Sequence, residues 1–260
     1  MAGKLDGRVA LVTGGGRGIG RGISIGLAED GATIAVNYRR DEEAARETVA
    51  AIEAKGGKAR MYAASIDSWD EDVAMVEQVV KDFGHIDILV NNAGIASRGQ
   101  SVHDTDPAEM ERVVRTHSFG PFYLSKLVLD SMRAQARGDI IMISSAATHS
   151  FAGNGSPYNM GKAALEALAY TLYKEERQHN VRVNIVAPGL VESDMGVRLA
   201  RAMQRNKDLS LRELDATSPF GHVCQPEDVA NVVRYLCSDG ASYLTGQRIY
   251  VDGGGNLFNY

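Results

Sequence analysis

Apolar residues gather in seven short runs along the chain, and each run is bounded by glycine, proline or polar side chains. Several of the runs, such as residues 9–12 and 140–143, are continuous, which predicts strands that are buried on both faces. The seven runs cover residues 8–13, 32–37, 58–63, 86–90, 139–144, 181–187 and 248–251. A seven-stranded parallel sheet is therefore expected.

Amphipathic stretches of helical period separate most of these runs. Strands that alternate with helices predict an α/β fold of the doubly wound, Rossmann type, with helices on both faces of the sheet. No linker or repeat divides the chain, so residues 1–260 are expected to form a single dinucleotide-binding domain. The expected helices follow residue 20 and cover residues 41–55, 69–83, 107–132, 158–179 and 226–237.

Residues 191–219 have a weaker period and are interpreted as a mobile helical lid over the substrate. Apolar side chains on one side of this segment include Met195, Leu199 and Met203. Basic side chains lie among them, at Arg198, Arg201, Arg205 and Lys207. These charges are expected to form a solvated face, although an acidic substrate or carrier is an alternative.

The amino-acid composition limits the classes of protein to which the chain can belong. The 260 residues are 44% hydrophobic, enough for one large core, and the formal net charge of −5 argues against nucleic-acid binding. Cys224 and Cys237 give no disulfide framework, and neither a signal segment nor a long apolar run is present. The expectation is a soluble cytoplasmic protein with no membrane partner and no metal.

A glycine-rich loop follows the first strand. It runs from Thr13 through Gly14, Gly18 and Gly20 into the first helix. Glycines let the backbone approach a ligand closely, and a helix start offers free N–H groups to a pyrophosphate. The alternative is a glycine-rich turn in an unrelated α/β protein.

The second strand ends in Tyr38, Arg39 and Arg40 with no acidic residue at its end. In dinucleotide-binding folds an acid at this place binds the ribose of NAD, whereas an arginine accommodates the extra phosphate of NADP. Arg17 in the glycine loop could reach the same phosphate. NADP is therefore preferred over NAD, unless the arginines only begin the charged face of the next helix.

Other candidate cofactor contacts also follow strands. Ser65 and Ile66 come after the third strand, where an adenine would rest. The fourth strand ends in residues 91–94, Asn-Asn-Ala-Gly, which could bridge neighbouring strands and face a cofactor, or could form only an Asx-type turn.

Tyr158 and Lys162 lie four residues apart, on one face of a predicted helix. A neighbouring cation favours the phenolate, so Lys162 is expected to lower the pKa of Tyr158 toward the range useful for acid and base catalysis. Ser145 follows the fifth strand, at the edge of the sheet where ligands bind, and is a plausible partner. Alternatively, Tyr158 is a packed ring beside a solvated lysine.

His117 lies within the long helix at residues 107–132, where it should pass under the site. A hydrogen-bonded core histidine and a catalytic role are equally consistent with this position.

Together the motifs resemble the short-chain dehydrogenase/reductase family, in its branch similar to 3-oxoacyl-(acyl-carrier-protein) reductases. The resemblance covers nearly the whole chain. The matching motifs are Thr13-Gly14-x-x-x-Gly18-x-Gly20, residues 91–94, Ser145, Tyr158-x-x-x-Lys162, Pro188-Gly189 and the ending Val251-Asp-Gly-Gly.

This resemblance implies strand order 3-2-1-4-5-6-7, a homotetramer, and a reaction between a nicotinamide and a ketone or secondary alcohol. Tyr158 is implied as the acid and base, Ser145 as the residue that orients the carbonyl, and Lys162 as the residue that holds the ribose. With the positions above, the candidate cofactor contacts are Gly14, Arg17, Gly18, Ile19, Gly20, Tyr38, Arg39, Ser65, Ile66, Asn92, Ala93, Gly94, Tyr158, Lys162, Pro188, Gly189 and Val191.

Three residues depart from the family pattern. His117 stands where many relatives have an asparagine that holds a water of the proton relay, so an imidazole would have to serve there or the relay is rerouted. Ser65 replaces a common aspartate, with Asp67 close by. Gly161 replaces a frequent serine, a change expected to be harmless.

The main hypothesis is an NADPH-dependent reductase of ketones or aldehydes that runs reversibly as an alcohol dehydrogenase. The alternatives are an NAD-linked dehydrogenase of a sugar, polyol or sterol alcohol, and a regulatory protein that binds the nucleotide without catalysis. The substrate depends on the lid and on residues whose positions the sequence does not fix, such as Thr148, Phe151, Gly153 and Met195.

Overall fold

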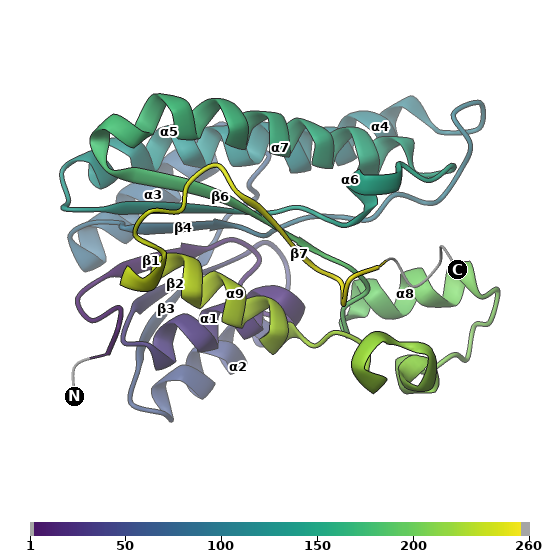
Figure 1. Cartoon of the computed structure of the whole chain (residues 1–260). Helices are drawn as coiled ribbons and strands as arrows, with labels where there is room; N and C mark the ends of the chain where they lie inside the picture. Colours follow the sequence, from purple (N-terminus) through teal and green to yellow (C-terminus); the bar gives the residue numbers. More distant parts are fainter. Residues whose placement is uncertain (1–2, 256–260) are drawn as a thin grey trace.

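The computed structural model describes residues 3–255, apart from the side chain of Met203, and has one seven-stranded parallel sheet (Figure 1). The strand order is β3-β2-β1-β4-β5-β6-β7, which confirms the predicted architecture. The strands are β1 (Val9–Val12), β2 (Thr33–Tyr38), β3 (Lys58–Ala63), β4 (Ile88–Asn91), β5 (Gly138–Ile143), β6 (Val181–Pro188) and β7 (Arg248–Val251).

Helices cover both faces of the sheet (Figure 1). One layer contains α1 (Gly18–Glu29), α2 (Glu42–Glu53) and α9 (Pro226–Cys237). The other contains α3 (Trp69–Phe83), α4 (Pro107–Val114), α5 (Gly120–Arg133) and α7 (Ser156–Glu176), while the short α6 (Ala147–Ser150) precedes α7.

Each layer has its own apolar core, because side chains of a strand buried on both faces point alternately to the two layers. Val12 and Val36 pack with Ile23 of α1 and Val233 of α9. Leu11 and Leu89 pack on the other side with Leu124 of α5 and Leu165 of α7. The continuous apolar runs in the sequence follow from this two-sided burial.

The long helix expected at residues 107–132 is interrupted. A π-helical turn, η1 (Arg115–Phe119), separates α4 from α5 and contains His117. One extra residue in a turn shifts the side chains that follow it, and such turns are frequent at functional sites. The interruption therefore changes which side chain faces the sheet at the position of His117.

The loops at the carboxyl ends of the strands meet beside an additional helical segment, which lies to the right of the two layers in Figure 1. It contains α8 (Asp194–Met203), η3 (Leu211–Thr217) and η4 (Pro219–Gly221). Leu190, Ala200, Leu209, Leu211 and Val223 form a small core of their own there. No helix within residues 3–255 is long and apolar enough to cross a membrane.

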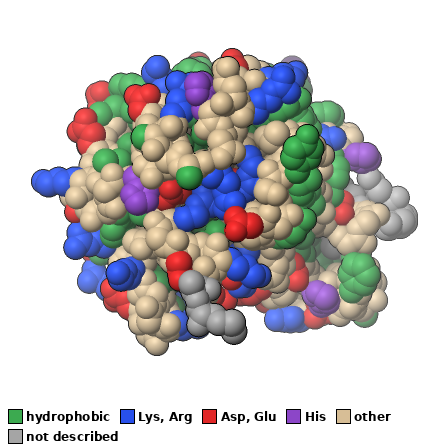
Figure 2. Space-filling model, turned by 60° about the vertical axis from the view of Figure 1, so that its left-hand side comes forward, with side chains coloured by type: hydrophobic (Ala, Val, Ile, Leu, Met, Phe, Trp, Pro, Cys, Tyr) green, Lys and Arg blue, Asp and Glu red, His purple; other side chains and the backbone are tan. Residues whose placement is uncertain are grey.

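Arginines stabilise the amino-terminal ends of the strands, opposite the ends where these loops meet. Arg8 at β1 and Arg182 at β6 form ion pairs of 2.8 and 2.6 Å with the buried carboxylate of Asp139 on β5. On the face drawn in Figure 2, basic side chains gather near the centre with acidic ones beside them. Charges of both signs are also mixed over the rest of this face, which gives no continuous basic footprint there.

Candidate active site

The glycine loop between β1 and α1 has the backbone that a bound pyrophosphate needs. Gly14 and Gly18 have φ angles of +58° and +52°, a region that favours glycine. The first turn of α1 has no side-chain cap, because Arg17 at its N-cap makes no capping hydrogen bond. Its N–H groups are therefore available to an anion.

Asn92 links this loop to β4. Its side-chain amide donates to the carbonyl oxygen of Thr13 at 2.8 Å, while the Thr13 hydroxyl accepts from the backbone N–H groups of Asn92 and Ala93 at 2.9 Å each. A Cβ at Gly20 would lie 2.6 Å from the same amide, so glycine is required for this packing. The bridging interpretation of residues 91–94 is thus confirmed over the simple Asx turn.

Asn37 at the end of β2 was missed by the sequence reasoning. Its side-chain oxygen accepts from the N–H of Gly14 at 3.1 Å, and its amide donates to the carbonyl of Ala64 at 3.1 Å. It fixes the glycine loop relative to β2 and β3. A buried amide at the end of an otherwise apolar strand was the available signal.

The predicted adenosine end is more exposed. Arg39 is exposed just after β2, while the guanidinium of Arg17 lies 3.4 Å from Asp41 and 3.5 Å from Asp194 at the start of α8. Ser65 donates to Asp67 at 2.6 Å, and Ile66 is buried in the adjoining core. The sequence did not predict the acidic partners of Arg17.

The predicted catalytic residues come together. The Ser145 hydroxyl lies near the Tyr158 phenol and favours its charged form, and both residues are partly exposed. Lys162 lies one turn further along α7 and is only 4% exposed. Its ammonium lies 5.8 Å from the centre of the Tyr158 ring and donates to the carbonyl oxygen of Ile143 at 2.6 Å.

The net pKa shift of Tyr158 is opposite to the lowering that was expected from Lys162. Burial raises the pKa of Tyr158, and the Ser145 hydroxyl only opposes this rise. The same burial lowers the pKa of Lys162 to about 7, although the negative charge of Glu166 favours its ammonium form. With its pKa raised by burial, Tyr158 is a protonated phenol at neutral pH.

His117 is 1% exposed and lies edge-on to Tyr158, with ring centres 5.2 Å apart. Its Nε2 lies 2.8 Å from the carbonyl oxygen of Ile95, which favours the tautomer that carries its proton on Nε2. Burial lowers the pKa of His117 to about 3, so the ring is neutral. Its Nδ1 is a buried acceptor without a hydrogen-bond partner among the described residues.

Two glycines make room for this ring. A Cβ at Gly161 would lie 2.8 Å from Cβ of His117, and a Cβ at Gly94 would lie 2.5 Å from its Cε1. The glycine in place of a frequent serine is therefore not incidental, since a larger residue at position 161 would press on the imidazole.

The expected lid, residues 191–219, follows the end of β6. Pro188 is the last residue of that strand, Gly189 donates to the carbonyl of Val251 at 3.0 Å, and Val191 is 3% exposed and pairs with Cys224. Gly18 of the glycine loop reaches this segment, because a Cβ there would lie 3.2 Å from Cβ of Ser193. The lid and the glycine loop are thus in contact.

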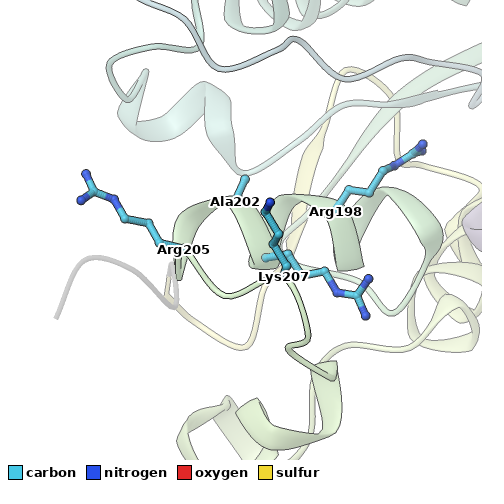
Figure 3. A pocket seen from close by; sticks show the side chains of 5 residues that line it. Arg198, Ala202, Arg205 and Lys207 are labelled. Atoms are coloured by element: carbon cyan, nitrogen blue, oxygen red, sulfur yellow. The ribbon is translucent and has the colours of Figure 1, made fainter.

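The basic side chains of α8 and of the turn that follows it do not converge on one point. Arg198, Arg201, Ala202, Arg205 and Lys207 line an open cavity of about 420 Å³. Figure 3 shows Arg198 and Arg205 pointing in opposite directions from the helix. This arrangement favours the solvated face over a site for one small acidic ligand.

This arrangement can donate a proton from a hydroxyl, next to a glycine loop whose backbone N–H groups can bind an anion. Ser145 and Tyr158 present two hydroxyls to a partly open space, and Lys162 places a cation beneath them. A carbonyl oxygen could accept from both hydroxyls and take the phenolic proton.

Comparisons with known proteins agree with this geometry. A family profile described as enoyl-(acyl carrier protein) reductase matches residues 14–256. Versicolorin reductase stcU of Emericella nidulans is 36% identical over 258 residues, covering 96% of each chain. The 3-oxoacyl-[acyl-carrier-protein] reductase FabG of Staphylococcus aureus is 37% identical over 245 residues, covering 94% of this chain and 96% of FabG.

A solved structure is also similar to this chain in fold. The angucycline C-6 ketoreductase LanV with bound NADP superposes with a TM-score of 0.87 at 32% identity, covering 98% of this chain and 97% of LanV. The similarity therefore extends from the glycine loop through the lid.

Proposed function

Because this chain belongs to the short-chain dehydrogenase/reductase family, we propose that it is an NADPH-dependent reductase of ketones that also oxidises the corresponding secondary alcohols. The observation that carries the proposal is the arrangement of Tyr158 near the Ser145 hydroxyl, with the Lys162 ammonium 5.8 Å from the centre of its ring. A phenol held in its protonated form is suited to the reductive direction, in which a proton must be donated.

The chain fits a nicotinamide dinucleotide. The glycines at 14, 18 and 20 leave the backbone open to a pyrophosphate, the first turn of α1 is uncapped, and Asn92 holds the loop in place. Arg17 and Arg39 would bind the extra phosphate of NADP, Lys162 the nicotinamide ribose, and Ser65 and Ile66 the adenine side. When bound, the nicotinamide supplies the hydride. The remaining proposed contacts are Ile19, Tyr38, Ala93, Gly94, Pro188, Gly189 and Val191.

The residues of the chain supply the proton and the orientation. Ser145 donates a hydrogen bond to the substrate oxygen and fixes its position. Tyr158 donates a hydrogen bond to the same oxygen and transfers its proton as negative charge develops there. In the reverse direction the phenolate accepts the proton of the alcohol.

Lys162 and His117 support Tyr158, Lys162 through its charge and His117 through its packing. The Lys162 ammonium stabilises the phenolate after proton transfer, because a cation within a buried site favours the charged form of its neighbour. His117 remains neutral and packs against the edge of the phenol ring, so it positions Tyr158 and does not itself titrate near pH 7. The segment at residues 191–219 would close over the substrate as a lid.

An NAD-linked alcohol dehydrogenase is the second candidate, and one observation favours it. Asp41 lies within 3.4 Å of Arg17, so a carboxylate is present close to the place of the adenosine ribose. An acid there would bind ribose hydroxyls and repel a phosphate.

We further propose that the enzyme is a homo-oligomer, with the homotetramer that the family resemblance implies. Exposed aromatic residues support a partner surface on this chain. Trp69, Phe119 and Phe122 all contact Tyr123 or stack beside it, and the two phenylalanines are 48% and 49% exposed. Light scattering of the purified protein tests this assembly.

Initial rates with a panel of cyclic and acyclic ketones, using NADPH and NADH in parallel, test the activity. The proposal predicts turnover with NADPH and a lower kcat/KM with NADH. Comparable or higher kcat/KM with NADH identifies the second candidate. Tight NADPH binding without turnover of any ketone or alcohol would instead indicate a regulatory nucleotide-binding protein.

A further inference from the structure

A buried carboxylate lies next to the proposed catalytic residues and has no part in the chemistry described so far. Glu166 is on α7, one turn after Lys162, and is only 6% exposed. An ionised carboxylate so well buried needs partners, and this one has three. They come from two segments other than its own helix.

Two of the partners lie on either side of Ser145. The Ser144 hydroxyl donates to Oε1 of Glu166 at 2.6 Å, and the Thr148 hydroxyl donates to the same oxygen at 2.8 Å. The Thr148 hydroxyl oxygen also lies 2.8 Å from the carbonyl oxygen of Ser145, so these two acceptors share its one proton. One carboxylate oxygen therefore closes the turn that presents the Ser145 hydroxyl.

The third partner comes from the last strand of the sheet. Arg248 on β7 donates to Oε2 of Glu166 at 2.8 Å, and its guanidinium lies 5.0 Å from the centre of the Tyr250 ring. Tyr250 in turn packs edge-on against His149 of α6, with ring centres 5.9 Å apart. The strand β7 thus supports the Ser145 turn both through Glu166 and through direct packing.

We propose that Glu166 is a positioning residue of this reaction, whose carboxylate fixes the Ser145 turn and provides the buried negative charge that accompanies the Lys162 ammonium. The inference deepens the proposed function and depends on it. It predicts that Glu166 influences catalysis without touching the substrate.

The same helix carries a matched control. Glu176 is 2% exposed and forms a bidentate pair with Arg133 at 2.6 and 2.9 Å, at the far end of α7 from Lys162. It is a buried carboxylate paired with an arginine, like Glu166, but it has no contact with the Ser145 turn. If Glu166 has only a structural role, substitutions of Glu166 and Glu176 should change kcat to a similar extent.

The test compares Glu166→Gln, Glu166→Ala and Glu176→Gln in the full-length protein. Glutamine keeps an oxygen for Ser144 and Thr148 but removes the charge, whereas alanine removes both. With a ketone and NADPH, we expect kcat to fall about tenfold in Glu166→Gln and about a hundredfold in Glu166→Ala, since small displacements of catalytic groups reduce rates by such factors. Glu176→Gln should keep kcat within about twofold.

The pH profile separates charge from packing. The groups that face this cluster are Tyr158, Lys162 and Tyr170 from α7, His117 from η1, His149 from α6, and Arg248 and Tyr250 from β7. Removing the negative charge of Glu166 makes the Lys162 ammonium less favourable, so the loss of activity at high pH should begin at a lower pH in Glu166→Gln. Glu176→Gln should leave the profile unchanged.

Hydrogen exchange of residues 144–149 provides a readout that needs no turnover. We expect exchange of this segment to be at least about threefold faster in Glu166→Ala than in the wild type, and unchanged in Glu176→Gln. If the wild-type protein reduces no ketone, the proposed function fails, and the exchange result still decides whether Glu166 fixes the turn.

Two results would overturn the inference. One is that both Glu166 variants have the same kcat, pH profile and hydrogen exchange as the wild-type protein. The other is full recovery of turnover in the double variant Glu166→Gln with Arg248→Met, which would show that Glu166 only neutralises Arg248.

Discussion

The two ends of the candidate site differ in how the fold holds them. At the reaction end, Lys162 and His117 are at most 4% exposed, and their polar atoms contact backbone carbonyls or neighbouring rings. At the phosphate end, the Arg17 side chain is 58% exposed, Arg39 is exposed, and the arginines of α8 and of the turn that follows it point in different directions.

This difference sets the size of the effects that each end can have. Water and salt compete with exposed charges, whose attraction is screened over about 8 Å at physiological ionic strength. Buried groups have no such competitor, so their protonation depends on desolvation and on each nearby dipole. Substitutions at the reaction end should therefore alter kcat strongly. Substitutions at the phosphate end should moderately alter the preference between NADPH and NADH.

The largest effect is expected at Tyr158. Tyr158→Phe removes the proposed proton donor and keeps the ring, so kcat should fall by about a thousandfold or more. The dissociation constant for NADPH, measured by fluorescence titration, should remain within a few-fold of wild type. Tyr170→Phe on the same helix is the control and should keep its activity; substantial turnover by Tyr158→Phe would refute the assigned acid.

A large pH effect should come from Lys162. Its pKa is lowered to about 7, so the ammonium is present below this pH and is lost as the pH rises through it. If the ammonium holds the ribose, kcat/KM for NADPH, which reports on the free enzyme, should fall above pH about 7. A profile that stays flat up to the ordinary lysine range near pH ~10 would contradict this role.

A smaller effect is expected from the glycine beside His117. Gly161→Ser would place a Cβ 2.8 Å from Cβ of His117, and such overpacking costs about 1–3 kcal/mol of folding free energy. It should also displace Tyr158 and lower kcat by about tenfold. The double variant Gly161→Ser with His117→Ala should regain stability in thermal unfolding, and a serine tolerated without any loss would show that the ring is free to move.

At the phosphate end, Arg39→Glu should shift the ratio of kcat/KM for NADPH and NADH toward NADH by about tenfold or more, because a guanidinium that binds phosphate is replaced by an acid. Arg40→Glu makes the same charge change one residue away and should have a weaker effect. Equal shifts in both variants would indicate a general charge effect, and an unchanged ratio in Arg39→Glu would remove this residue from the site.

The smallest effects are expected on α8 and the turn that follows it. Arg198→Ser and Arg205→Ser should each change kcat/KM for a neutral ketone by less than about twofold, since exposed charges contribute little. Kinetics at low and high salt check this. A tenfold loss restricted to anionic ketones would show that these arginines contact the substrate after all.

The fold was predictable because the central strands are buried on both faces. Runs such as residues 140–143 are then apolar throughout, and the glycine loop and Pro188 mark where strands end. The π-helical turn at residues 115–119 was not predictable, because one extra residue barely changes the local hydrophobic period. Its consequence for His117 depends on packing against Gly94 and Gly161, which are distant in sequence.

The candidate site was predictable in its members but not in its electrostatics. Spacing alone placed Tyr158 and Lys162 on one helix face, and strand ends placed Ser145 beside them. The pKa of Tyr158 depends on burial, which spacing does not reveal, and so its direction was wrong. Asn37 and Glu166 were missed because their partners lie on other segments.

The central claim is that a protonated Tyr158 donates to a ketone oxygen while the cofactor delivers a hydride to the ketone carbon. Mass spectrometry of the product formed with NADPH that carries deuterium at both hydrogen positions of C4 tests this most directly, with the wild type and Tyr158→Phe compared in single turnovers. The account predicts a secondary alcohol with one deuterium on its carbinol carbon from the wild type and almost none from the variant. Product without deuterium, or deuterium transfer by Tyr158→Phe at the wild-type rate, would contradict it.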